Sequence, residues 1–280
     1  MFLSFEAKKI SDAYHTNSLA IRKELKNIFE SAIIGTSNEL NFINKLVKEF
    51  ENNYALLSPN GYKLNINSAI IHHKPIVSYI FNGNIIRCEL GDMLVTIKYH
   101  LSSGAIETKS IIYQIKLAKG DSDKCIIDND QLVLMSYWPS LYFGKKSDGG
   151  QKEYRVFPIT LEFGSYMLEL RSPKSENRLK YYKSYGTCPY AIQIMTYGPK
   201  EIYLNKGMYC RCDYSNIFSQ LAFDIGESHI NTGICNLVEA LYRYIGMAPD
   251  PPHEFDEYSN VIDGDGFSVM EINVIPNMQG

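Results

Sequence analysis

Two polar motifs that could form a reactive site lie inside apolar, strand-like stretches: Glu89-Leu90-Gly91-Asp92 and Gln114-Ile115-Lys116. They supply carboxylates, an amide oxygen and an ammonium group. Because alternate side chains of a strand project from the same face, Gln114 and Lys116 share one face and Ile115 points to the other. Hydrolysis of a phosphodiester with the help of a divalent cation needs such groups, so the spacing predicts chemistry of that kind.

The polar pair Gln114 and Lys116 is unusual for its surroundings, because the rest of residues 111–118 is apolar. Burying an amide and an ammonium group on such a strand is costly unless both have partners. Asp92, on the preceding strand, is the partner that we expect. A divalent cation would complete the site, Mg²⁺ or alternatively Mn²⁺, with Asp92, the Gln114 side-chain oxygen and the Ile115 backbone carbonyl as oxygen ligands.

Each member of this site is expected to have its own task. Lys116 would orient or help to deprotonate the attacking water, or stabilise negative charge on the phosphate. Glu89 stands three residues before Asp92, so on a regular strand the two side chains would face opposite ways. A bulge at Gly91 would bring both to one side, and Glu89 is therefore a second-rank candidate metal ligand.

Hydrophobic periodicity indicates both helices and strands along the chain. Helices are expected at 17–33, from a cap at Thr36 or Ser37 to Tyr54, and at 129–138, 216–225 and 233–244. Strands are expected at 68–72, 76–81, 85–99, 110–117, 189–197 and 267–274, with a hairpin of 155–163 and 166–170 around Gly164-Ser165. The runs 85–99 and 110–117 are expected to pair as a hairpin.

The order of these motifs resembles the restriction-endonuclease-like superfamily of PD-(D/E)XK nucleases, in a variant in which Gln114 replaces the second acid. Two flanking segments resemble bacterial proteins tied to antiphage defence: Ile71-His72-His73-Lys74-Pro75-Ile76-Val77 and Asp130-Gln131-Leu132-x-Leu134-x-x-x-Trp138-Pro139. The resemblance covers roughly residues 36–145. It implies an α/β fold with a restriction-endonuclease-like core, a central mixed sheet flanked by helices, and a C-terminal α+β elaboration.

The resemblance also implies a domain organisation and a function. Residues 1–150 would form the nuclease core with its N-terminal helices, and 151–280 a C-terminal extension that regulates it or docks a partner. The protein would be a Mg²⁺-dependent endonuclease acting on DNA in preference to RNA, the effector of an antiphage defence system. Its partner would be a protein of the same system, such as a helicase or ATPase. Such nucleases often carry a further acid on the first core helix, and Glu39 is the best candidate.

Charge is unevenly distributed along the chain. Residues 1–150 carry 17 Lys and Arg against 15 Asp and Glu, and residues 151–280 carry 11 against 16. Contacts with a polyanion are therefore expected in the first half, and the acidic second half would repel nucleic acid, meet a basic partner or simply be solvated. No apolar run reaches the roughly 18 residues that span a bilayer, and the first residues lack the pattern of a signal peptide, so we expect a cytoplasmic protein without membrane contact.

Alternative interpretations remain open at this stage. The chain could be a nuclease-fold subunit that no longer cuts and binds nucleic acid or a partner protein. It could also be an interaction protein whose motif is accidental, in which case Asp92 and Lys116 would be exposed and far apart. A buried network of Asp92, Gln114 and Lys116 without a metal ion is a further alternative. Other candidates are weaker. The pair His72-His73 and the segment Asp263-Gly264-Asp265-Gly266 are expected to be ordinary structural residues, and the isolated cysteines are expected to be free and buried.

Overall fold

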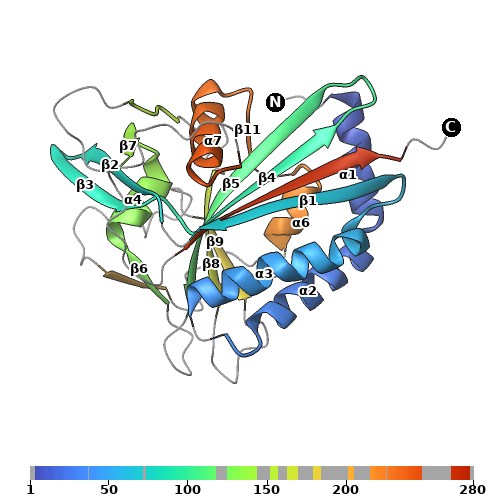
Figure 1. The fold of residues 1–280 in the computed structure, drawn as a ribbon, viewed down its shortest axis with the longest axis horizontal. Coiled ribbons are helices and arrows are strands. Elements are labelled where there is room, and N and C mark those ends of the chain that lie inside the picture. Colours follow the sequence, from blue (N-terminus) through green and yellow to red (C-terminus); the bar gives the residue numbers. More distant parts are fainter. Residues whose placement is uncertain are drawn as a thin grey trace.

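A mixed seven-stranded sheet forms the centre of the molecule in the computed structural model (Figure 1). The structure describes residues 4–36, 38–71, 74–117, 125–143, 152–156, 163–169, 179–183, 201–204, 215–224, 226–247 and 266–277. Six strands follow one another across the sheet in the order β1 (Tyr62–Ile71), β12 (Phe267–Pro276), β4 (Met93–His100), β5 (Ile106–Leu117), β8 (Gly164–Glu169) and β9 (Leu179–Lys183). The short β11 (Glu227–Ser228) also pairs with β5.

Neighbouring strands of this sheet are both parallel and antiparallel. β4 and β5 form an antiparallel hairpin, whereas β12 runs parallel to β4 and β8 runs parallel to β5. Side chains alternate between two apolar cores on opposite faces of the sheet. On β4, for example, Met93 and Val95 belong to one core and Leu94 to the other. The molecule is therefore an α/β protein whose mixed sheet is buried on both faces.

Helices α1 (Phe5–Thr16), α2 (Ser18–Ile33), α3 (Glu39–Asn53) and α6 (Ser215–Leu221) contribute to the first core. A single-turn 3₁₀ helix, Tyr54–Leu57, follows α3. The apolar stripe of α3 is buried, and its start is fixed by Asn38, whose side chain accepts a hydrogen bond from the backbone N–H of Asn41 at 2.8 Å. Such a cap satisfies a backbone donor that the helix itself leaves without a partner.

The second core lies against the other face of the sheet, under helices α4 (Asn129–Tyr137) and α7 (Thr232–Tyr244). A three-stranded antiparallel sheet of β3 (Asn84–Glu89), β2 (Ile76–Phe81) and β7 (Leu141–Phe143) adds to this core. A two-stranded sheet is formed by β6 (Cys125–Asp128) and β10 (Glu201–Leu204). In Figure 1 the three-stranded sheet lies on one side of the molecule, and the long strands of the main sheet fan out toward the other.

Many of the elements predicted from the sequence are present. The helices at 17–33, 129–138 and 233–244 are confirmed within one residue or so at each end, as α2, α4 and α7. The hairpin of β4 and β5 is also confirmed. Trp138 is fully buried, and with a φ of 44° it ends α4 in the left-handed conformation.

Other predictions were wrong at particular places. Residues 85–99 are not one strand, because β3 ends at Glu89 and β4 begins at Met93 in a different sheet. Gly164 and Ser165 are not a hairpin turn but the first residues of β8, which pairs antiparallel with β9. Helix α3 begins after Asn38 and not after Thr36 or Ser37. The predicted helix at 216–225 ends at Leu221, and the sequence reading missed α1 altogether.

The later part of the chain contributes directly to the main sheet. β12 is inserted between β1 and β4, and β8 and β9 extend the sheet beyond β5. The division at residue 150 into a core and an extension stays a prediction. The predicted strand 189–197, the pair His72-His73 and residues 263–265 lie outside the described residues. Within the described part, no helix is long and apolar enough to cross a bilayer.

Candidate functional site

Asp92 occupies the point where the two sheets diverge. Its backbone is held on both sides, because its N–H donates to the Tyr113 carbonyl at 2.9 Å and its carbonyl accepts from the Ser268 N–H at 3.0 Å. The side chain is completely buried. Its Oδ2 atom accepts hydrogen bonds from the backbone N–H of Ile115, at 2.6 Å, and from the Gln114 side-chain amide. The carboxylate therefore has a fixed orientation beside β5.

The cation that Asp92 holds is Lys74, which the sequence reading did not assign to the site. Lys74 Nζ lies 2.8 Å from Asp92 Oδ1 and 3.0 Å from Glu89 Oε2, and its side chain is only 6% exposed. Burial alone would lower the pKa of Lys74, but the charges of Asp92 and Glu89 and the hydrogen bonds to both raise the pKa above its ordinary value. Lys74 is therefore a charged ammonium group bridging two carboxylates.

Glu89 joins Asp92 for a reason other than the expected bulge. β3 ends at Glu89, and the backbone changes sheet before β4 begins at Met93. In between, the Leu90 N–H donates to the Pro75 carbonyl at 2.9 Å, next to the β2–β3 pairing. The change of direction lets Glu89 and Asp92 share the Lys74 ammonium, although they would face opposite ways on one continuous strand.

Gln114 is completely buried and belongs to a chain of side-chain amides. Its Nε2 donates to Asp92, and its Oε1 accepts from Gln131 Nε2 at 3.0 Å. The same Gln131 nitrogen donates to Glu89 Oε2 at 3.1 Å. Gln131 stands near the start of α4, whose first turn is capped by Asp128. The expected contact of Gln114 with Asp92 is therefore present, but it is made through the amide nitrogen and not the oxygen.

Lys116 and Glu39 form a second ion pair at the same end of β5. Lys116 Nζ lies 3.7 Å from Glu39 Oε2, and both side chains are partly exposed, at 17% and 28%. Glu39 is the first residue of α3, so the start of this helix lies beside the end of the strand that carries Gln114. The structure thus brings the predicted helical acid to the predicted lysine.

Gly91 is required by close packing at this point. A Cβ atom at this position would lie 2.5 Å from Cγ2 of Ile112 and 3.3 Å from the Tyr113 carbonyl oxygen. Ile112 is completely buried on β5, so a shift of its side chain would disturb the residues packed around it. The absent side chain lets residues 90–92 lie directly against β5, which is the approach that the Asp92 hydrogen bonds need.

The types of residue at this site, carboxylates and an amide, suit a hard divalent cation. Asp92 and Glu89 already converge on one positively charged group, the Lys74 ammonium, and the side-chain amide of Gln114 adjoins Asp92. No group of three or more His, Cys, Asp or Glu side chains among the described residues is placed to hold a metal ion. Mg²⁺ commonly binds proteins through one or two carboxylates and keeps several waters, so two carboxylates are sufficient.

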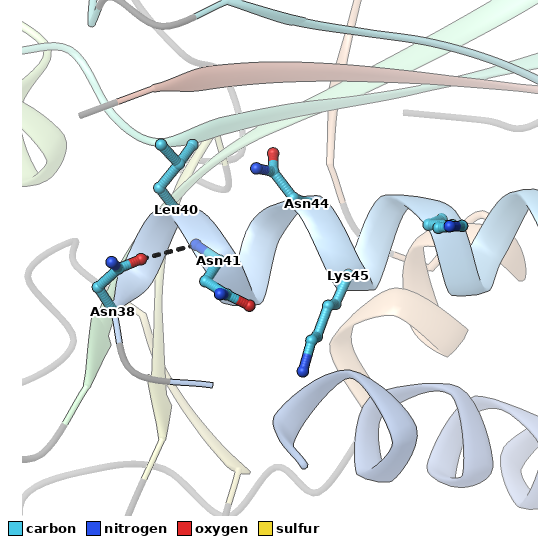
Figure 2. Close-up of a pocket in the computed structure, with 6 residues that line it drawn as sticks. Asn38, Leu40, Asn41, Asn44 and Lys45 are labelled. Atoms are coloured by element: carbon cyan, nitrogen blue, oxygen red, sulfur yellow. Dashed lines mark hydrogen bonds between the residues drawn. The ribbon is translucent and has the colours of Figure 1, made fainter. Parts of the chain in front are cut away.

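A separate depression lies on α3, next to Glu39 in the sequence but without Glu39 in its lining. Figure 2 shows its lining and the hydrogen bond by which Asn38 caps the helix. The depression has a volume of about 350 Å³ and is lined by Asn38, Leu40, Asn41, Asn44, Lys45 and Lys48. Because Asp92, Gln114 and Lys116 are not among the lining residues, the candidate site is defined by its polar network and not by this hollow.

Lys74 and Gln131 are members of the network that neither motif contains and that were not predicted as site residues. Both stand in the segments that flank the two motifs, 71–77 and 130–139, so the sequence indicated these segments but not these two residues. Their contacts connect the segment before β2, the end of β3, α4 and β5 at the junction of the two sheets. The spacing of residues along one hairpin could not indicate such contacts.

The fold and the site define an α/β protein with a mixed sheet, flanked by helices, and a buried network of carboxylate, ammonium and amide groups where two sheets diverge. Comparison of the chain with protein-family models, with curated proteins and with solved structures finds no match. Arguments about function therefore rest on the residues and their geometry.

Proposed function

We propose that the chain is a divalent-metal-dependent nuclease of restriction-endonuclease-like fold that hydrolyses phosphodiester bonds, in DNA in preference to RNA. The observation that carries the proposal is the convergence of the Asp92 and Glu89 carboxylates on one cation, the Lys74 ammonium, beside Gln114 on β5. Two carboxylates that bind one cation, with a second lysine, Lys116, on the same strand as Gln114, suit the hydrolysis of a phosphodiester.

The proposed division of labour follows from the contacts of each residue. Asp92 is held by Ile115 and Gln114, so its remaining oxygen, Oδ1, faces the cation position. Glu89 supplies the second carboxylate. Lys116 is more exposed than Asp92 and can reach a phosphate, where it would stabilise negative charge in the transition state. Glu39 positions Lys116 through their ion pair.

A bound Mg²⁺ or Mn²⁺ would be held by Asp92 and Glu89, with Gln114 and the Ile115 carbonyl as further oxygen donors. When bound, such an ion supplies a lower pKa for an attacking water and positive charge beside the phosphate. The protein excludes bulk water from Asp92, which strengthens every electrostatic interaction made there.

The biological role in this proposal is that of an effector in antiphage defence. It is supported by the resemblance of residues 71–77 and 130–139 to defence proteins. The net charge of −3 favours weak binding of free nucleic acid. A partner such as a helicase or ATPase would then bring the substrate to the site.

Cleavage assays with purified variants test the proposal. Plasmid, single-stranded DNA and RNA are incubated with wild-type protein in Mg²⁺ or in EDTA, with and without extract from phage-infected cells to supply an activating partner. Asp92→Ala and Lys116→Ala should abolish cleavage, and Lys63→Ala, at an exposed position on β1, should leave it unchanged. Equal cleavage by wild type and Lys116→Ala would refute the division of labour.

A second candidate function is that of a nuclease-fold subunit that no longer cuts. One observation favours it: the ammonium of Lys74 already contacts the carboxylate oxygens of Asp92 and Glu89 that a metal ion would bind. Such a subunit would bind nucleic acid or a partner with the same affinity in Mg²⁺ and in EDTA. Metal-dependent cleavage by the wild type would exclude this candidate.

A further inference from the structure

The ammonium of Lys74 stands at the position that a divalent cation would take. A cation bound by Asp92 and Glu89 would contact the two oxygens that now contact Lys74 Nζ, at 2.8 Å and 3.0 Å. Two cations cannot share these oxygens at such distances, because their mutual repulsion in a buried site is large. Pairing with Lys74 and binding of a metal ion at these oxygens therefore exclude each other.

The amide groups around the pair are oriented for the ammonium and not for a metal ion. Gln114 presents its Nε2, a donor, to Asp92, whereas a metal ligand must present Oε1. That oxygen faces Gln131 Nε2 at 3.0 Å. Gln131 Oε1 is buried and has no hydrogen-bond partner among the described residues. Rotation of both amides by half a turn would give this oxygen a donor from Gln114 and turn Gln114 Oε1 toward Asp92.

The rotation has a cost at both carboxylates. At Asp92, it replaces the hydrogen bond from Gln114 Nε2 to Oδ2 by a contact of two oxygens, which is unfavourable unless a metal ion lies between them. Gln131 Nε2 now donates to Glu89 Oε2 as well as to Gln114, at 3.1 Å. After rotation an oxygen would face this carboxylate, which is unfavourable unless a metal ion lies against Glu89. The identity of the cation and the orientation of both amides are therefore coupled, and the site has two self-consistent arrangements.

We propose that Lys74 is a built-in competitor for the metal ion and that the site loads a divalent cation only when the Lys74 ammonium leaves Asp92 and Glu89. This inference rests on the proposed function and names its regulation. The Lys74-paired arrangement holds the site closed and lowers its apparent metal affinity by the fraction of molecules in the open arrangement. A phosphate of the nucleic acid would provide the departing ammonium with a new counter-ion, so substrate and metal ion would favour each other's binding.

Titration of the protein with Mn²⁺, followed by isothermal calorimetry, tests this competition without reference to catalysis. Lys74→Met should bind Mn²⁺ roughly ten-fold more tightly than wild type if the closed arrangement holds about nine-tenths of the molecules. Lys116→Met removes the same charge from the same region and should give a clearly smaller gain. Equal gains in both variants would overturn the inference, because they would indicate a general effect of charge.

A labelling experiment on the wild type keeps the test valid if Lys74→Met does not fold. Acetylation of Lys74, measured by mass spectrometry relative to Lys63, should rise when millimolar Mg²⁺ is added, and in Asp92→Asn it should not depend on Mg²⁺. Unchanged acetylation of Lys74 at saturating metal would overturn the inference. If the wild type still cleaved nucleic acid in a Mg²⁺-dependent manner, the proposed nuclease function would remain valid without this inference. Absence of Mn²⁺ binding in the wild type and in folded variants would overturn both the nuclease function and the competition by Lys74.

Discussion

Gly91→Ala is the substitution that tests most directly how the chain builds its site. The added Cβ would lie 2.5 Å from Cγ2 of the buried Ile112, so residues 90–92 must move away from β5. Overpacking of this kind costs about 1–3 kcal/mol. The movement also stretches the hydrogen bond of Asp92 N–H with the Tyr113 carbonyl, now 2.9 Å, whose loss adds about 1 kcal/mol.

The measurement for Gly91→Ala is urea unfolding followed by circular dichroism. We expect a lower midpoint with an unchanged slope, and weaker Mn²⁺ binding because the Asp92 carboxylate is displaced. Ile112→Ala removes the methyl group responsible for the overlap, although it leaves a cavity that costs about 2–5 kcal/mol by itself. The double variant should lose less stability than the sum of the two single losses, by about 1 kcal/mol. Additive losses, or a midpoint of Gly91→Ala equal to that of wild type, would refute the steric argument.

Two further predictions concern stability elsewhere in the molecule. Asn38→Ala removes the cap of α3 and should cost about 1 kcal/mol in urea unfolding, whereas Asn38→Asp should cost much less; equal losses would exclude the cap as the cause. Burial, together with the charge of Lys98, lowers the pKa of His229 from 6.5 to about 4, against an opposing effect of Glu239. Folding therefore favours the neutral imidazole of His229. Its contribution to the free energy of unfolding is fully present above pH 6.5 and is lost as the pH falls from 6.5 toward 4, by about 3 kcal/mol in all. In His229→Gln this part of the pH dependence should disappear, and an identical dependence in both proteins would contradict the assignment.

Local sequence patterns were sufficient to predict several of the helices and strands. The apolar stripe of α3, the capped start of α4 and the alternation along β5 all depend on residues close together in the chain. The contact between Asp92 and Gln114 was predictable for the same reason, because a hairpin fixes which residues of its two strands lie opposite each other. Helix α1 was missed, although Ala7, Ile10 and Tyr14 are buried at helical spacing.

The boundary between β3 and β4 and the position of Lys74 depend on long-range pairing, which local sequence patterns do not indicate. The run 85–99 is apolar on both sides of Gly91, and only the pairing of β3 with β2 and of β4 with β5 shows where one strand ends and the next begins. The same change of sheet brings Lys74 to Asp92 and Glu89. An ion pair between segments far apart in the sequence leaves no periodic pattern along one strand, so Lys74 could not be identified from spacing as the ionic partner of Asp92.

The place of β12 in the sheet has a consequence for the order of events during synthesis. Residues 267–276 pair with β4 on one side and β1 on the other, and the Ser268 N–H holds the Asp92 carbonyl. Asp92 is translated long before these residues, and until they leave the ribosome the edge of β4 has no partner there. The nascent chain thus carries Asp92 without this support for most of its synthesis, and the network around Asp92 is completed only when residues 267–276 are inserted.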